Sequence, residues 1–415
     1  MLQNPCTLFI QSGKFLAPWV VAAAIVAAPP PAGSAPPTQE VFTATSLVTG
    51  LGSQKITAFD ISFVDPNLNL YLLADRTNKA VDVVDTTTNT LEVRLLSLLC
   101  PTAATPCPFA GATGNNDTSG PDGVLTIGHE VWAGDGNSTI KVISLVSGVT
   151  TDVINTGGTK RADELCYDPD DQLVMMANDA DSPPFVTLIS TVSHAILKTI
   201  KMDGTGGAPI ATNGIEQCQY SSSTGKFYLN IPEVNGPGND TQPGAVLQIS
   251  PQGVIEKTFS IPLAKCAGPQ GMALGPENQI LLGCNNPNHT VPSTVIINAR
   301  SGTVIHVLAN EDGSDEVWFN EGDGHYFLAE NAALPNQRLG VVDAQTGKED
   351  PSATTGAGGA GGNHSVAADP VKNQVYVPIG STSGSSICGS LGGSNSQGCI
   401  AVFTTMGSDM PGHQP

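Results

Sequence analysis

The sequence predicts an all-β fold, a seven-bladed β-propeller whose ring is closed by an N-terminal strand, and three observations predict it. A phrase of two apolar strands joined by a polar turn returns seven times along the 415 residues. Within each phrase apolar and polar residues alternate with a period of two, which is typical of strands. A further strand-like segment precedes the first phrase. Repeats of this length, with four strands each, are typical of propellers.

The phrases can be followed by eye in the sequence. The first is FDISFVDPNLNLYLLAD, and it is trailed by the strand pair AVDVVDTTTNTLEVRL. The other six begin as DGVLTIGHEVWAGDG, DELCYDPDDQLVMMAND, EQCQYSSSTGKFYLNIP, QGMALGPENQILLGCN, DEVWFNEGDGHYFLAEN and HSVAADPVKNQVYVP. Gly, Pro, Asn and Asp separate the apolar runs, and no long amphipathic helix is predicted.

The ring also has a predicted closure. The last repeat supplies only three strands and ends near Thr405, while the segment EVFTATSLV at residues 40–48 has no partner of its own. Pairing this segment as the outer strand of the last blade closes the ring and removes its open edges. We therefore expect one propeller domain over residues 36–405 and a flexible C-terminal tail at 406–415.

Residues 1–35 are predicted to be a signal peptide. Lys14 is followed by an apolar run at residues 15–28 and then by the small and proline-rich PPPAGSAPP, with cleavage expected near Ala35. A membrane anchor is the alternative, but the apolar run is short for a bilayer. The sequence thus predicts a secreted or periplasmic protein without stable membrane insertion.

The cysteines support export. Eight remain once Cys6 is removed with the signal, and an even number in an exported chain predicts disulfides. Their positions in the repeats pair Cys100 with Cys107, Cys388 with Cys399, and Cys266 with Cys284, which leaves Cys166 and Cys218 as the remaining two. Cys166 and Cys218 lie on inner strands of neighbouring blades, but their positions in the repeat differ by one residue. A zinc site is the alternative, although C-x-x-C spacing is absent.

The charge balance limits the partners. Only 13% of residues are charged, and the net charge is −20. An acidic surface repels a nucleic-acid backbone, so we expect no nucleic-acid partner. We expect a monomer that binds a small-molecule substrate or an extracellular ligand.

One position of the repeated phrase is polar in every repeat. Because the first strand of each blade lines the central channel, these residues are expected to form a ring. They are Asp60, Asp122, Asp163, Glu216, Gln270, Asp315 and His364.

The ends of the second strands should open on the same face as this ring. They carry oxygen ligands at Asp75, Asp135, Asn178, Asp179, Glu233, Asn285, Glu330 and Asn331. The predicted substrate-binding residues are Gln270, Asp75, Asp135, Asn178, Asn285 and Asn331.

Two hypotheses compete for the ring. Crowded carboxylates repel one another unless a cation, protons or water offset them. A metal site would use Asp60, Asp122, Asp163, Glu216, Asp315 and His364. The oxygen ligands favour Ca²⁺ or Mg²⁺, and the imidazole admits Zn²⁺, Mn²⁺, Fe or Cu. A merely hydrated channel mouth is the other hypothesis. By strand alternation, Glu164 and Glu316 should point away from the channel, into the blade or toward its neighbour, where backbone groups or a side chain such as that of Arg161 would satisfy them.

The repeat phrase, as in AVDVVDTTTNT and LGVVDAQTGK, resembles the YncE-like and NHL-like propellers. The polar residues that begin the inner strands are similar, more loosely, to the gluconolactonase and senescence-marker-protein family. That resemblance implies a divalent metal that polarises a lactone carbonyl, with Glu216, Asp163 and Asp315 in comparable places. The ring here differs in carrying His364 and Gln270, and the blade count is seven rather than six.

The sequence thus favours a metal-dependent hydrolase or lyase, lactonase-like, on a small oxygen-rich substrate. Proton transfer would fall to His364, Asp163 or Glu216. The alternatives are a non-catalytic module that recognises a protein, glycan or cell-wall component, and a redox site with a transition metal on His364.

Overall fold

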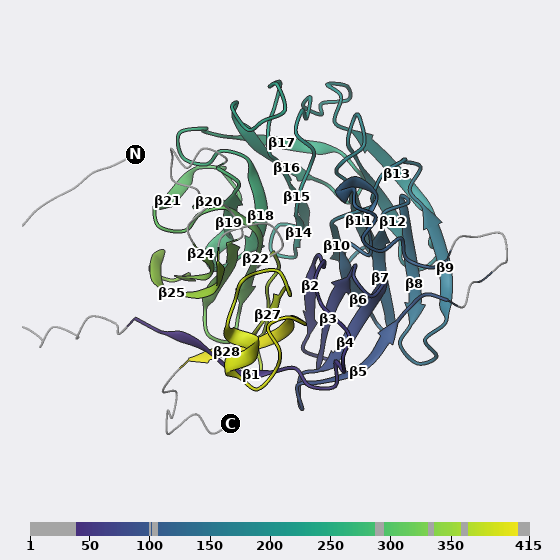
Figure 1. The fold of residues 1–415 in the computed structure, drawn as a ribbon. Coiled ribbons are helices and arrows are strands. Elements are labelled where there is room, and N and C mark those ends of the chain that lie inside the picture. The colour runs from purple at the N-terminus through teal and green to yellow at the C-terminus, as the bar shows by residue number, and fades with distance from the viewer. Residues whose placement is uncertain are drawn as a thin grey trace, which may run out of the picture. The chain divides into compact units, whose positions relative to one another are not determined.

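The protein is described by a computed structural model covering residues 39–98, 101, 107–286, 294–330, 336–357 and 364–405. These residues form seven antiparallel sheets of four strands each, arranged as a ring (Figure 1). The predicted seven-bladed propeller is therefore confirmed. The predicted signal peptide at 1–35 and tail at 406–415 fall outside the described residues. Within the described part of the chain, no helix is long and apolar enough to cross a membrane.

Each of the first three blades runs in chain order from its inner strand to its outer strand. The first contains β2 (Ser62–Asp65), β3 (Leu70–Asp75), β4 (Ala80–Asp85) and β5 (Thr90–Leu95). The second contains β6 (Val124–Ile127), β7 (Glu130–Asp135), β8 (Thr139–Ser144) and β9 (Thr150–Asn155). The third contains β10 (Leu165–Asp168), β11 (Leu173–Asn178), β12 (Phe185–Ser190) and β13 (Ile196–Lys201).

The next three blades follow the same order. The fourth contains β14 (Cys218–Ser221), β15 (Lys226–Ile231), β16 (Gly244–Ile249) and β17 (Ile255–Ile261). The fifth contains β18 (Pro269–Leu274), β19 (Gln279–Cys284), β20 (Thr294–Asn298) and β21 (Val304–Leu308). The sixth contains β22 (Ser314–Asn320), β23 (His325–Glu330), β24 (Asn336–Asp343) and β25 (Lys348–Ala357).

The seventh blade closes the ring with strands from both ends of the chain. It contains β26 (Ala367–Asp369), β27 (Gln374–Ile379), β28 (Cys399–Thr405) and β1 (Phe42–Leu47). β1 pairs with β28 in antiparallel register, with Phe42 opposite Thr405 and Leu47 opposite Ala401. Figure 1 shows this pairing as purple β1 beside yellow β28. The predicted closure is confirmed.

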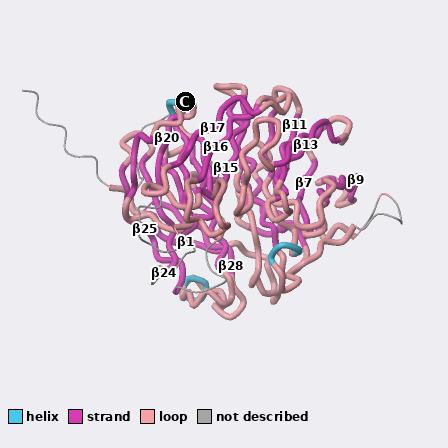
Figure 2. Tube along the Cα trace, turned by 90° about the horizontal axis from the view of Figure 1, so that it is seen from above, coloured by secondary structure: helices cyan, strands magenta, loops and turns pink. Residues whose placement is uncertain are grey.

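Burial decreases from the second strand to the outermost strand, as in the first and third blades. The second strands, such as β3 and β11, are buried along their whole length because neighbouring blades pack against both of their faces. Tyr71 of the first blade stacks on Tyr376 of the seventh with ring centroids 4.7 Å apart. The outermost strands, such as β13, are largely exposed. Figure 2 shows that the strands form the body of the propeller, and the described helices are only η1 (Asn116–Thr118), η2 (Pro276–Asn278) and α1 (Ile387–Ser390).

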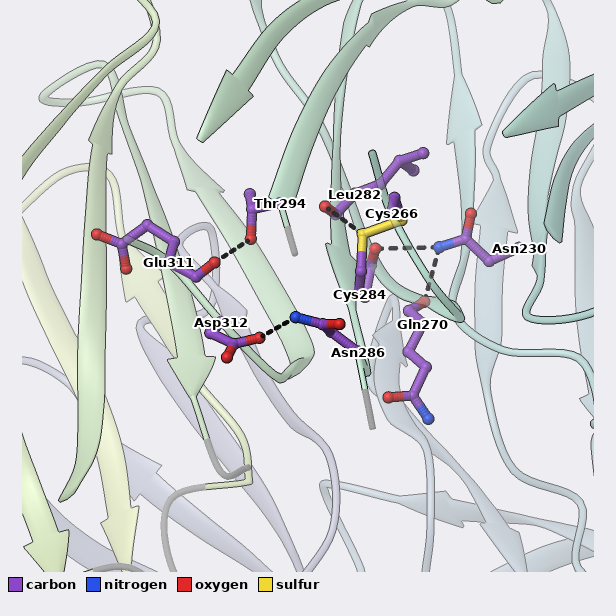
Figure 3. The surroundings of a disulfide bond; sticks show 10 residues. Asn230, Cys266, Gln270, Leu282, Cys284, Asn286, Thr294, Glu311 and Asp312 are labelled. Atoms are coloured by element: carbon purple, nitrogen blue, oxygen red, sulfur yellow. Dashed lines mark hydrogen bonds between the residues drawn. A yellow bond between two sulfur atoms is a disulfide. The ribbon is translucent and has the colours of Figure 1, made fainter. Parts of the chain in front are cut away.

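Three of the four predicted disulfides are present. Cys166 is bonded to Cys218, Cys266 to Cys284, and Cys388 to Cys399. Figure 3 shows the second of these at the end of β19. The fourth prediction, Cys100 with Cys107, involves Cys100, which falls outside the described residues. Three disulfides indicate an oxidising compartment.

The one-place offset between Cys166 and Cys218 does not prevent their bond. Inner strands of neighbouring blades pack through side chains rather than through a shared hydrogen-bond ladder, so facing residues need not hold the same place in each repeat. The two Cα atoms are 5.8 Å apart, within the usual range for a disulfide.

A buried histidine next to the closing strand makes stability depend on pH. His325 Nε2 lies 3.2 Å from Asp350 Oδ2, and its ring packs edge-on against Phe42 of β1. Burial disfavours the imidazolium, but Asp323, Glu40 and Asp350 outweigh it and raise the pKa of His325 from 6.5 to about 9. A raised folded-state pKa contributes stability that is full below pH 6.5 and is lost as the pH rises through about 9.

We therefore expect the wild-type protein to lose roughly 1–3 kcal/mol more stability than His325→Gln between pH 6 and about 9.5. Urea unfolding at several pH values measures this difference. His129→Gln, at an exposed turn, is the matched control and should follow the wild type. Parallel pH profiles for wild type and His325→Gln would contradict the assignment.

Candidate functional site

The residues at the repeated polar position do converge. Six of the seven line one cavity of about 480 Å³ at the channel mouth: Asp60, Asp163, Glu216, Gln270, Asp315 and His364. Asp122 is fully buried and does not line this cavity, but it is joined to Asp60 through an arginine. The convergence follows from the fold, since each residue stands at the beginning of an inner strand.

A β-bulge sits at this position in several blades. The amide of Asp163 donates to the carbonyl of Ala177, and the amide of Ala177 donates back to the carbonyl of Glu164. Two residues thus face one, which interrupts the alternation of side chains. The first, second and fourth blades repeat this pattern at Asp60, Asp122 and Glu216. The register of β22 shifts between Ser314 and Glu316 as well.

The bulge overturns one prediction, that Glu164 and Glu316 point away from the channel. Both side chains line the cavity, are 5% exposed, and are hydrogen-bonded to each other. Two carboxyl groups can form such a bond only if one of them carries a proton. Burial and the neighbouring acids, foremost Asp60 for Glu164, raise the pKa of Glu164 to about 7 and that of Glu316 well above its usual value.

Arg76 is the residue directly after β3, and its side chain binds members of the ring of polar residues. Its Nη2 donates to Asp60 and, at 2.5 Å, to Asp122 Oδ1, while its Nη1 donates to Asn116 Oδ1 at 2.8 Å. The Arg76 side chain is 7% exposed. Although burial alone would raise the pKa of Asp60, Arg76 and His364 hold it well below its usual range. Asp60 is therefore ionised.

Arg161 provides a second guanidinium two residues before Asp163. Its Nη2 lies 2.9 Å from Asp163 Oδ2 and 2.6 Å from Asp179 Oδ2, and its Nε donates to Asp179 Oδ1 at 3.1 Å. Asp179 is one of the predicted second-strand ends. The pair of contacts to Asp179 is bidentate, which fixes the guanidinium plane against the cavity wall.

His364 joins two ring members. Its Nε2 lies 2.7 Å from Asp60 Oδ1, and its Nδ1 lies 2.9 Å from Asp315 Oδ2. Burial disfavours the charged ring, but Asp315 and Asp60 outweigh it and raise the pKa of His364 to about 10. The side chain is therefore an imidazolium at neutral pH, donating both of its N–H groups to carboxylates.

Glu216 and Gln270 complete the wall opposite Arg76. Burial, with repulsion from Asp315 and Asp179, raises the pKa of Glu216 well above its usual value, which favours the protonated carboxyl. It nevertheless remains partly accessible from the cavity. Figure 3 shows Gln270 with its backbone carbonyl bound by Asn230 and its side-chain amide extending away from that contact.

Most of the predicted second-strand residues lie outside the cavity lining. Asp75 accepts from Asn78, and Asp135 forms a buried ion pair with Lys141 at 2.7 Å. The amide of Asn178 donates to Ser138 and that of Asn285 to Asp240. Glu233 accepts four backbone amides of the loop that follows it, and Glu330 pairs with Arg338. Asn331 falls outside the described residues. These side chains therefore stabilise the loops on the face of the propeller that carries the cavity.

Three of the predicted metal ligands form a group that could hold a metal ion. Oxygens of Asp60, Asp122 and Asp163 lie within 4.8 Å of one another. Asp122 Oδ2 is buried without a hydrogen-bond partner among the described residues, so it is a free ligand atom. Carboxylate oxygens suit hard cations such as Ca²⁺ and Mg²⁺. Arg76 and Arg161 already offset part of this charge, and both oxygens of Asp60 are engaged.

Sequence reasoning missed the arginine pair at the ring. The signal was present, because the chain has only 17 basic residues and two of them adjoin predicted site positions. Arg76 directly follows Asp75, and Arg161 lies two residues before Asp163. A cation next to a predicted ring of carboxylates is a natural counter-charge.

Comparison with known proteins gives no match to any family model and none to a curated protein.

Proposed function

We propose that the cavity at the channel mouth is the active site of a hydrolase or lyase for a small oxygen-rich substrate, with a divalent cation bound at Asp60, Asp122 and Asp163. The observation that carries this proposal is the excess of carboxyl groups over cationic side chains in a cavity of about 480 Å³. Structural ion pairs alone would leave the two signs closer to balance. Unbalanced buried carboxyl groups are held by protons or by a metal ion, and both serve acid–base chemistry.

The residues divide into those that would bind the ion and those that would handle protons. Asp122 Oδ2 and Asp163 supply ligand oxygens, with Asp60 completing the set. A bound divalent cation would supply Lewis acidity toward a substrate oxygen. Arg76 and Arg161 hold the three carboxylates close together and limit how tightly a cation binds.

Glu216 is the proposed general acid. Its pKa is raised and its carboxyl is accessible from the cavity, and proton donation to a leaving oxygen requires both. Asp315, which lies 2.9 Å from the His364 imidazolium, is the proposed group for proton removal. The amide of Gln270 can hydrogen-bond a substrate hydroxyl or carbonyl. Acid and base thus differ because their surroundings differ.

The family relationship and the cellular location of the protein are part of the same proposal. The repeat phrase supports kinship with YncE-like and NHL-like propellers and, more loosely, with the gluconolactonase family. The predicted signal peptide, together with the three disulfides, supports a secreted or periplasmic monomer.

The metal is tested on the purified protein without any substrate. We expect stoichiometric Ca²⁺ or Mg²⁺ by elemental analysis, and a lower melting temperature after chelation that the same ion restores. Asp122→Asn should lose this response, whereas Asp117→Asn at the cavity rim should keep it. A protein without metal, whose melting temperature no divalent cation raises, would contradict the metal site.

Catalysis is tested with a panel of lactones and carboxylic esters. For any substrate that is turned over, Glu216→Gln is expected to lower kcat/KM by about 10²–10⁴-fold, since it removes the proton donor. Glu92→Gln, on the exposed β5, is the matched control and should keep full activity. Equal activity of Glu216→Gln and wild type would remove Glu216 from the mechanism.

A non-catalytic binding module is the second candidate, and one observation favours it. Arg76 and Arg161 already bind the carboxylates that a catalytic metal would use. A recognition site with fixed charges of both signs would look the same. Ligand binding without turnover across the panel, together with absence of metal, would decide for this candidate.

A further inference from the structure

A second cavity lies further along the same channel. Its volume is about 820 Å³, and it is lined by later residues of the inner strands and by the turns that follow them, including Ser222 and Pro276. The two cavities share only Ile61 and Glu164. The hydrogen-bonded Glu164–Glu316 pair therefore lies between the acidic cavity and this one. The function proposed above makes no use of the second cavity.

Several aromatic side chains line this second cavity. Five inner-strand residues from four strands contribute rings that are neither fully buried nor fully exposed: Phe63, Tyr167, Tyr220, Trp318 and Phe319. Phe63 and Trp318 meet edge to face with centroids 5.7 Å apart. In a well-packed protein, large rings are usually driven into the core, and each of these leaves accessible apolar area unused.

The remaining lining defines what kind of molecule would fit. Leu125, Leu165 and Leu274 add aliphatic surface, and polar groups come from glutamine, threonine and serine side chains, among them Gln219 and Thr126. Among the described residues that line the cavity, the charged ones are both acidic, Glu164 and Glu321. A pocket of 300–1,000 Å³ with apolar walls and a few polar groups is typical of small-molecule sites. Acidic groups, in a chain of net charge −20, disfavour an anionic ligand.

We propose that this second cavity, at the opposite end of the channel from the acidic site, binds a planar aromatic molecule that carries no negative charge. Ring-on-ring contacts with Trp318, Tyr167 and Tyr220 supply the recognition, since aromatic pairs gain energy beyond the area they bury. Gln219, on β14, supplies a hydrogen bond in the plane of the ligand. The site is independent of the chemistry at the channel mouth.

The test uses the neutral probe N-phenyl-1-naphthylamine, which fluoresces in apolar surroundings, with the intact protein. We expect saturable binding of one probe per protein, accompanied by quenching of tryptophan emission. Trp318 is the reporter, because it lines the cavity, whereas Trp132 is fully buried and does not line it, and Trp19 belongs to the predicted signal peptide. The anionic analogue 1-anilinonaphthalene-8-sulfonate should bind at least tenfold more weakly.

Variants of the lining residues test whether the probe binds in the second cavity. Gln219→Phe fills the cavity and is expected to weaken probe binding at least tenfold, while Gln252→Phe, at an exposed turn outside the lining, leaves it unchanged. Tyr167→Ala removes one wall and should also weaken binding if Gln219→Phe proves too unstable to measure. Melting temperatures establish that each variant is folded.

The outcomes separate this inference from the proposed function. Glu216→Gln should leave probe binding unchanged, and Gln219→Phe should leave any turnover unchanged, because Glu216 does not line the second cavity and Gln219 does not line the first. Probe binding that fails to saturate, or that survives both Gln219→Phe and Tyr167→Ala in folded protein, would overturn the proposal. Equal binding of the neutral and anionic probes would overturn its charge preference.

Discussion

Arg76→Met is expected to destabilise the propeller by about 3–5 kcal/mol, because it removes the buried guanidinium that binds two buried carboxyl groups, of which Asp60 is ionised. Arg76 is 7% exposed and binds Asp60 and Asp122 together. Methionine keeps much of the volume, so the loss is electrostatic rather than a cavity effect. Urea unfolding at neutral pH measures it. Arg300→Met, at an exposed position, is the matched control and should cost less than about 1 kcal/mol.

Arg76→Met also tests whether the arginine and a metal ion compete for the same carboxyl groups. With the guanidinium gone, Asp60 keeps only His364 as a paired cation and Asp122 loses its ion pair, so a divalent cation can take the place of the guanidinium. We expect Ca²⁺ to raise the melting temperature of Arg76→Met more than that of wild type. A destabilised variant that gains nothing from Ca²⁺, Mg²⁺ or Mn²⁺ would mean that these carboxylates serve the ion pair alone.

Removing the Cys166–Cys218 bridge as a double alanine variant is expected to cost about 4 kcal/mol, since the closed loop spans 52 residues and loop-closure entropy grows with length. For Cys388–Cys399, with a separation of 11, the same relation gives about 3 kcal/mol. The longer bridge also joins inner strands of two blades, so its loss loosens the channel wall.

The comparison between the two double variants is the measurement. Urea unfolding should rank the Cys166–Cys218 variant below the Cys388–Cys399 variant, and both below wild type. The reverse order would show that local packing around α1 outweighs chain entropy at the shorter bridge. Equal stability of all three proteins would remove the disulfides from the folding energetics.

The fold could be predicted from the sequence because it is built from repeats. Seven recurrences of one phrase fix the blade number, and the unpartnered strand at 40–48 fixes the closure that β1 and β28 make. The three disulfides followed from the place of each cysteine in its repeat. Each of these conclusions depends on the backbone path, which hydrophobic periodicity encodes directly.

The candidate site was predicted less completely because it depends on side-chain direction. Convergence of Asp60, Asp163, Asp315 and His364 was foreseen from their shared position. The orientation of Glu164 was predicted wrongly, because a β-bulge places two successive residues opposite one and alternation fails there. A bulge at a strand start leaves no clear mark in a single sequence.

By itself the sequence determined the seven blades, the closing strand, three cysteine pairs and the ring of polar residues, since all of these follow from repetition. Only the tertiary structure decided which charges meet. Arg76 binds Asp122 of the next blade, and Glu164 meets Glu316 from three blades away. Such pairs form because closure of the ring brings residues from different blades close together. Neither periodicity nor spacing along the chain predicts which of these side chains come into contact.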